Sequence, residues 1–139
     1  MANTLRLEIV TPEARTYSED VDMVVLPGVE GELGIFPLHV PLMTELNPGE
    51  LRVLKDGREL ALAVGEGFAE VTQEKVSVLT DMAIEESAID EEAVQKAIAR
   101  AEEAMRTQDK MSTEEVAAVQ AALQKSLAQL RVKRRRHGV

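Results

Sequence analysis

Few residues in this chain of 139 have side chains that could carry out catalysis. Its only histidines are His39 and His137, and it has no cysteine, so the three or four clustered ligands of a zinc site are missing. No serine lies in the Gly-x-Ser-x-Gly context of a hydrolase nucleophile, and Gly65-Glu66-Gly67 lacks the Lys-Ser/Thr that completes a phosphate-binding loop. The sequence therefore predicts a non-catalytic protein that uses no cofactor and no metal.

The amino-acid composition argues against nucleic acid as a partner and against a membrane-spanning segment. The net charge of −9 opposes a phosphate backbone, and an aromatic content of 2% leaves no platform on which bases could stack. The start of the chain shows no signal-peptide pattern. Its longest strongly apolar stretch without charge, residues 33–44, is too short for a bilayer that needs ~20 residues. We expect neither a nucleic-acid partner nor a membrane span.

The end of the chain reverses the overall sign of charge. Residues 1–87 hold 17 acidic and 6 basic side chains, whereas residues 131–139 hold basic ones only. Such a run is either a solvated, frayed tail or a tip that contacts an acidic protein surface. The candidate residues of this basic tip are Arg131, Lys133, Arg134, Arg135 and Arg136.

The stretch from Glu30 to Leu42 has the composition of a protein-contact loop. Its two glycines permit tight backbone geometry around one carboxylate, and its two prolines stiffen a segment that presents an imidazole beside apolar residues. A rigid loop loses little conformational entropy when it binds. The candidate contact residues are Gly31, Glu32, Gly34, Pro37, His39 and Pro41.

The first part of the chain, residues 1–84, reads as strands. Leu5, Leu7 and Ile9 alternate with polar residues, and residues 21–26 form a second β-rich run. Residues 51–54 and 59–64 flank an Asp-Gly turn typical of a hairpin, and a further alternating pair follows at 68–72 and 75–79. Turn signals every 8–12 residues without helices between them predict an all-β sandwich or barrel.

The second part, residues 85–139, reads as two helices. Asp90 is a candidate N-cap, and Ser112 with Glu115 forms a capping box that opens the second helix. A short polar link at 107–110 predicts an antiparallel helical hairpin, which makes the whole chain α+β. Its alanine-rich seams bury little area, so the hairpin is either weakly held and able to change partners or a fixed cap on the β-domain. The apolar seam positions are Val94, Ala97, Ile98, Ala101 and Met105, then Val116, Val119, Leu123, Leu127 and Leu130.

The 31–42 stretch fits Gly-Glu-x-Gly-x-x-Pro-x-His-x-Pro-Leu, and with it the chain resembles the epsilon subunits of F-type ATP synthases, called delta in mitochondria. Val10-Thr11-Pro12, residues 65–71 and residues 128–132 support the resemblance in the same order along the chain. It implies a β-sandwich that clamps the gamma subunit and rests on the c-ring, within a rotor that couples proton or sodium-ion flow to ATP synthesis. Glu32 and His39 fall on positions associated with the c-ring contact.

The resemblance also implies a regulatory role for the hairpin. It would pack on the sandwich or extend along gamma towards the catalytic alpha and beta subunits and slow ATP hydrolysis, with the basic tip as its contact. The implied location is peripheral, on the cytoplasmic face of a bacterial inner membrane, with a plastid thylakoid less favoured. A free-standing protein–protein adaptor of the same architecture is the alternative.

One position departs from the family pattern. Some bacterial members bind ATP at the hairpin through Ile/Leu-Asp-x-x-Arg-Ala; here Ile89 and Asp90 match, but Ala93 stands at the arginine position. The second helix offers only Lys125 before Arg131. Because a triphosphate needs several cationic donors, we expect weak ATP binding or none.

Overall fold

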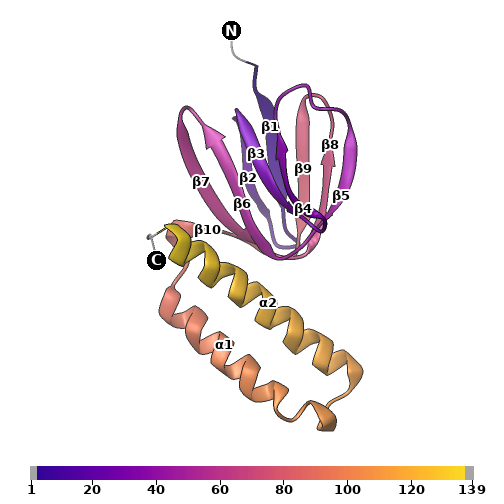
Figure 1. The fold of residues 1–139 in the computed structure, drawn as a ribbon, viewed down its shortest axis with the longest axis vertical. Coiled ribbons are helices and arrows are strands. Elements are labelled where there is room, and N and C mark those ends of the chain that lie inside the picture. Colours follow the sequence, from indigo (N-terminus) through magenta and orange to yellow (C-terminus); the bar gives the residue numbers. More distant parts are fainter. Residues whose placement is uncertain (1–2, 137–139) are drawn as a thin grey trace.

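The computed structural model describes residues 3–136, which form a curled β-sheet followed by two packed helices (Figure 1). This confirms the α+β class and the barrel-like β-domain. The strands are β1 (Leu5–Val10), β2 (Arg15–Val21), β3 (Met23–Gly28), β4 (Gly31–Ile35), β5 (Leu42–Leu46), β6 (Gly49–Lys55), β7 (Arg58–Val64), β8 (Gly67–Val71), β9 (Lys75–Thr80) and β10 (Ala83–Glu85).

The strands form one continuous sheet that curls into a half barrel. Their order across it is β10-β7-β6-β3-β5-β8-β9-β1-β2, with β4 paired to β3 beside this path. Neighbours run antiparallel except β1 and β9, which are parallel. The inward-facing side chains of the alternating strands fill the concave side, where Leu7, Ile9 and Val24 are fully buried.

Local turn chemistry matches the expectation at the β6–β7 hairpin. Asp56 and Gly57 have φ of 52° and 76°, the two successive positive values that a two-residue hairpin turn of type I′ requires. The amide of Asp56 also donates to Asp22 Oδ2 at 3.0 Å, which ties the turn to the start of β3.

Four strands, β2, β4, β5 and β10, lie where the sequence indicated none. Most of β2 lies outside the predicted strands because Glu19 and Asp20 interrupt its alternation; it is an edge strand, where charge is common. Gly31–Ile35 was interpreted as loop, but it pairs with β3 along its whole length as β4. Ala83–Glu85, expected within a polar connection, pairs with the end of β7 as β10.

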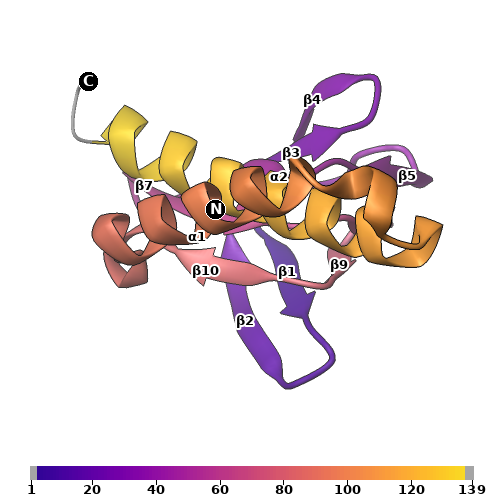
Figure 2. The ribbon, with the colours of Figure 1, turned by 90° about the horizontal axis from the view of Figure 1, so that it is seen from below.

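The helical hairpin consists of α1 (Glu91–Met105) and α2 (Thr113–Arg136), with short 3₁₀ turns at Glu86–Ala88 and Gln108–Lys110. Both predicted caps are confirmed. Asp90 Oδ1 accepts the Ala93 amide at 3.1 Å, and Ser112 and Glu115 exchange backbone–side-chain bonds of 3.0 and 3.1 Å. The bond donated by the Ser112 backbone amide to the carboxylate is the largest cause of the lowered pKa of Glu115. Viewed from below, α1 lies in front of α2, and both helices cross the lower end of the sheet (Figure 2).

Candidate functional site

The predicted contact segment divides into a strand and a loop. Gly31 turns the chain into β4. Its φ of 125° is a backbone conformation that residues other than glycine rarely adopt. Gly34 has no such backbone; a methyl group there would instead meet Met23 Cε at 3.0 Å. Only residues 36–41, which include Pro37 and Pro41, form a loop, and the Leu38 amide fixes it to the β8–β9 turn by donating to Gln73 O at 2.9 Å.

The structure does not bring Glu32 and His39 together. Glu32 lies beside the β3–β4 turn, whereas His39 lies in the loop beyond the far end of β4. Strands rise about 3.3 Å per residue, so β4 alone puts roughly 10 Å between Glu32 and the start of the loop. His39 Nδ1 donates to the adjacent Val40 carbonyl at 2.7 Å. The two candidate residues therefore lie at opposite ends of β4 and not side by side in one loop.

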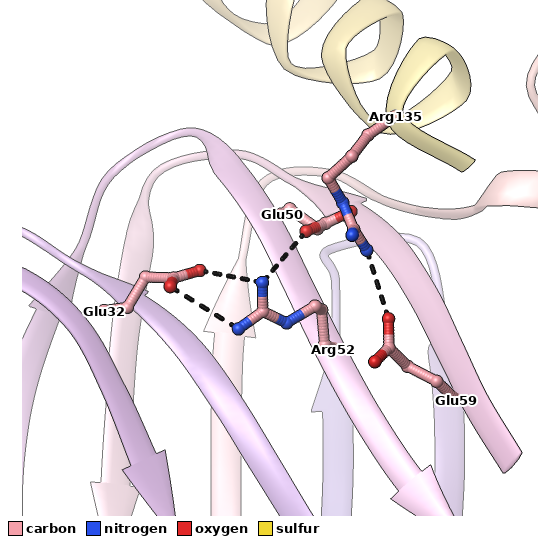
Figure 3. A network of polar contacts seen from close by, with 5 residues as sticks. All are labelled: Glu32, Glu50, Arg52, Glu59 and Arg135. Atoms are coloured by element: carbon pink, nitrogen blue, oxygen red, sulfur yellow. Dashed lines mark hydrogen bonds and ion pairs between the residues drawn. The ribbon is translucent and has the colours of Figure 1, made fainter. Parts of the chain in front are cut away.

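Glu32 belongs to a network that reaches the end of α2 (Figure 3). Across β3, Arg52 binds both of its carboxylate oxygens, at 3.3 and 3.4 Å, and contacts Glu50 at 3.6 Å. Arg135 of α2 then donates to Glu50 at 2.7 Å and to Glu59 at 3.1 Å. The bond to Glu50 raises the pKa of the Arg135 guanidinium. The Glu50 side chain is only 9% exposed, and these two arginines compensate its carboxylate.

The hairpin docks through a small apolar cluster outside the barrel. Ala61 and Ala63 of β7 face outward there and pack with Ile89, Val94 and Val132. Val132 is fully buried although it lies within the basic run. Since α2 contacts β6 and β7, it lies between the sheet and α1 (Figure 1).

The basic tip is the docked end of α2. Lys133 pairs with Glu86 at 3.5 Å, Arg134 with Glu91 at 3.9 Å, and Arg135 joins the network above. Arg131 is exposed and forms no ion pair with the described side chains. The side chain of Arg136 and all of His137 lie outside the described part. The frayed-tail interpretation is therefore wrong for residues 131–136, which are helical.

Exposed apolar residues gather on the outer face of β1, β8 and β9. Phe68 and Leu79 are cross-strand neighbours and are 52% and 56% exposed, and Leu79 also neighbours Val10. Phe36 and Val40, 57% and 73% exposed, lie apart from this pair, in the loop held at the β8–β9 turn. Apolar surface concentrated in this way is typical of a protein interface.

An acidic groove of about 500 Å³ opens beside the β3–β4 turn. Glu45, Glu66 and Asp81 line it together with Val29 and Phe68. Lys125 of α2 reaches Asp81 at 3.5 Å. The groove and Glu32 lie near the same turn, which gives this end of the sheet an acidic surface.

The residues at the positions of the family's nucleotide motif support the fold of the hairpin or are exposed to solvent. Ile89 is 4% exposed within the docking cluster, Asp90 caps α1, and Ala93 is exposed. Within residues 3–136 no cluster of three His, Cys, Asp or Glu side chains could hold a metal ion, and no helix is long and apolar enough to cross a membrane.

Sequence reasoning missed Glu50, Arg52 and Val132. Glu50 and Arg52 lie on the same face of β6, but nothing local marks them. Arg52 meets Glu32 only because β4 and β6 both pair with β3. Val132 continues the spacing of Ala128 at four residues, and both are buried. That spacing was the available signal for a second apolar face on α2.

Two family models match the chain almost end to end. The model of the ATP synthase delta/epsilon chain β-sandwich domain matches residues 4–86, and that of the delta/epsilon chain long α-helix domain matches residues 87–134.

Relatives of known name match over similar lengths. The ATP synthase epsilon chain of Herpetosiphon aurantiacus is 44% identical over 92% of this chain and 93% of its own. That of Desulforamulus reducens is 44% identical over 94% and 98%. Among solved structures, a chain of the Euglena gracilis mitochondrial ATP synthase OSCP/F1/c-ring structure shares a TM-score of 0.72 and 25% identity, covering 90% of this chain and 78% of that one. A Tetrahymena thermophila central stalk/c-ring chain shares the fold, with a TM-score of 0.54 and 13% identity over 95% of both.

Proposed function

Because this chain belongs to the delta/epsilon family of ATP synthase chains, whose members are non-catalytic subunits, we propose that it works in the central stalk of a rotary ATP synthase. Residues 1–84 bind the gamma subunit and the c-ring, and residues 85–139 regulate ATP hydrolysis. The subunit sits peripherally on the cytoplasmic face of the membrane and helps to couple proton or sodium-ion flow to ATP synthesis. The observation that carries the proposal is the match of both family models along almost the whole chain, and the exposed apolar face, the acidic end of the sheet and the docked hairpin support it.

The exposed apolar face around Phe68 and Leu79 supports the gamma contact. Apolar side chains on a rigid sheet can be buried against a partner with little loss of conformational entropy. The acidic end of the sheet, with Glu32 and the adjacent groove, supports a contact with a cationic loop of the c-ring. Gly31 shapes the turn there and Gly34 gives β4 room beside β3, while Pro37, His39 and Pro41 belong to the loop.

Replacing Glu32 by Gln together with His39 by Ala is expected to uncouple proton pumping from ATP hydrolysis. Since the two side chains lie at opposite ends of β4, we expect their effects to add, as for sites without shared partners. ATP-driven proton pumping and hydrolysis, measured together in membrane vesicles, give the coupling ratio. Glu30→Gln removes the same charge from the neighbouring turn and serves as the control. An unchanged ratio in the double variant would contradict the c-ring contact.

The docked hairpin supports a regulatory role. In this form Lys133, Arg134 and Arg135 are occupied by acidic groups of the chain itself and are not available to the catalytic subunits. Release would expose the same charges, and with them a contact for the alpha and beta subunits. High salt should then weaken the inhibition.

Truncation after Ser87 tests that role directly. A head assembled with gamma and the truncated chain is expected to hydrolyse ATP several-fold faster than one with the intact chain, on the order of the 5–150-fold range of allosteric couplings. Steady-state hydrolysis is the measurement, with incorporation of both chains checked first. Equal rates would contradict the proposed regulation of ATP hydrolysis and leave the proposed role in the central stalk unaffected.

A further inference from the structure

We propose that Arg52 couples Glu32 to the docking of α2. When a cationic group of a partner binds Glu32, Arg52 pairs with Glu50 alone. The contact between Arg135 and Glu50 then weakens and the hairpin is released. Conversely, release of the hairpin makes Glu32 available to the partner. The inference rests on the proposed function only for the identity of that partner.

The coupling begins with one shared nitrogen. Arg52 Nη1 lies 3.3 Å from Glu32 Oε2 and 3.6 Å from Glu50 Oε1, so one nitrogen of the guanidinium, with its two N–H groups, faces two carboxylates (Figure 3). The shorter distance is to Glu32, whose second oxygen also accepts from Nη2 at 3.4 Å. Arg52 is therefore drawn towards Glu32 in the docked form, and Glu50 is left with a longer contact to it.

That arrangement leaves Glu50 to Arg135. Its Oε2 accepts from Arg135 Nε at 2.7 Å, the shortest contact in the network. Glu50 is 9% exposed and Arg52 27%, so water screens their interaction less than it screens an exposed surface pair. If Arg52 moves, or loses the carboxylate that balances its charge, its interaction with Glu50 changes. Because Glu50 also binds Arg135, the strength of the Arg135 contact changes with it.

The sign of the coupling follows from charge. If Glu32 is neutralised or taken by a cation, the guanidinium of Arg52 loses its compensating carboxylate. It then attracts Glu50 more strongly and repels Arg135, and both effects weaken the docking of α2. Coupling is reciprocal, so departure of Arg135 must make Glu32 more available.

Release does not leave a buried charge without a partner. When Arg135 departs, Glu50 keeps Arg52, and the other carboxylate bound by Arg135, Glu59, is 41% exposed to water. The large penalty for an unpaired buried carboxylate is thereby avoided. Glu50 can exchange one arginine for the other, as a two-state element requires.

The test measures hairpin position in the full chain without any partner. The chain has no cysteine, so Asp109→Cys in the link between the helices and Glu74→Cys in the β8–β9 turn give two specific spin labels. Their distance distribution reports the ratio of released to docked molecules. A Val132→Ala background, applied to every variant, thins the docking cluster and brings the released form into the measurable range.

Glu32→Gln is expected to raise the released-to-docked ratio roughly two- to five-fold, the range of a partly exposed ion pair. Arg52→Gln should lower the ratio, because Glu50 then has Arg135 alone. In the Arg52→Gln background, Glu32→Gln should have no further effect. Glu30→Gln is the matched charge control and should leave the ratio unchanged.

The coupling is overturned if Glu32→Gln changes the ratio no more than Glu30→Gln does, or if its effect persists without Arg52. Assembly of the same variants with the c-ring separates this outcome from failure of the proposed function. A weakened assembly with no effect on the hairpin would retain the c-ring contact and reject the coupling. The reverse pattern would retain the coupling and reject the c-ring as the partner of Glu32.

Discussion

Val132→Asp is expected to detach the helical hairpin from the sheet while the half barrel stays folded. Val132 is fully buried against the outward-facing alanines of β7, in a cluster separate from the barrel core. The substitution loses apolar burial and places a carboxylate where docking would bury it, which together cost about 3 kcal/mol or more. That corresponds to a shift of about a hundredfold towards the released hairpin.

Spin-label distances and small-angle scattering would both report this change as an extended chain. Ala122→Asp is the matched control, because it adds the same charge to an exposed position of the same helix. Under the proposed regulation, Val132→Asp should also strengthen inhibition of ATP hydrolysis, since the released form carries the free basic tip. A hairpin as closely docked as that of Ala122→Asp would show that the ion pairs, and not the apolar cluster, hold α2.

The parts of the fold that could be predicted are those with local causes. The alternation of Leu5, Leu7 and Ile9, the Asp-Gly turn and both helix caps each depend on residues within a few positions of one another. β4 was missed because its two glycines indicate a loop, and only pairing with β3 makes it a strand. Pairing across the sheet is a tertiary effect that propensity does not contain.

The candidate site shows the same division. The glycine pattern correctly marked Gly31 as a special backbone position, with its positive φ. The separation of Glu32 from His39 could not be predicted, because it depends on the segment between them being extended. Nor could the basic run be paired from sequence, since its acidic partners Glu50, Glu59 and Glu86 come from strands and turns up to 85 positions away.

Gly67→Ala is expected to destabilise the β-domain severely for a single added methyl group. A Cβ at this position would lie 1.9 Å from the Leu79 carbonyl oxygen and 2.8 Å from Thr80 Cα. Both obstacles are backbone atoms of β9, the strand paired with β8 at this point, so no side-chain rotation can relieve the clash. Thr80 is further held by its hydroxyl, which bonds the Glu66 and Met82 carbonyls at 3.0 and 3.2 Å. The strands must therefore separate.

We expect a loss of roughly 3 kcal/mol in the free energy of unfolding, at the upper end of the usual cost of overpacking. Urea unfolding followed by circular dichroism measures it. Gly34→Ala is the control, since its methyl group would meet only the mobile Met23 Cε at 3.0 Å and should cost less than about 1 kcal/mol. Equal losses would mean that β8 and β9 can part freely.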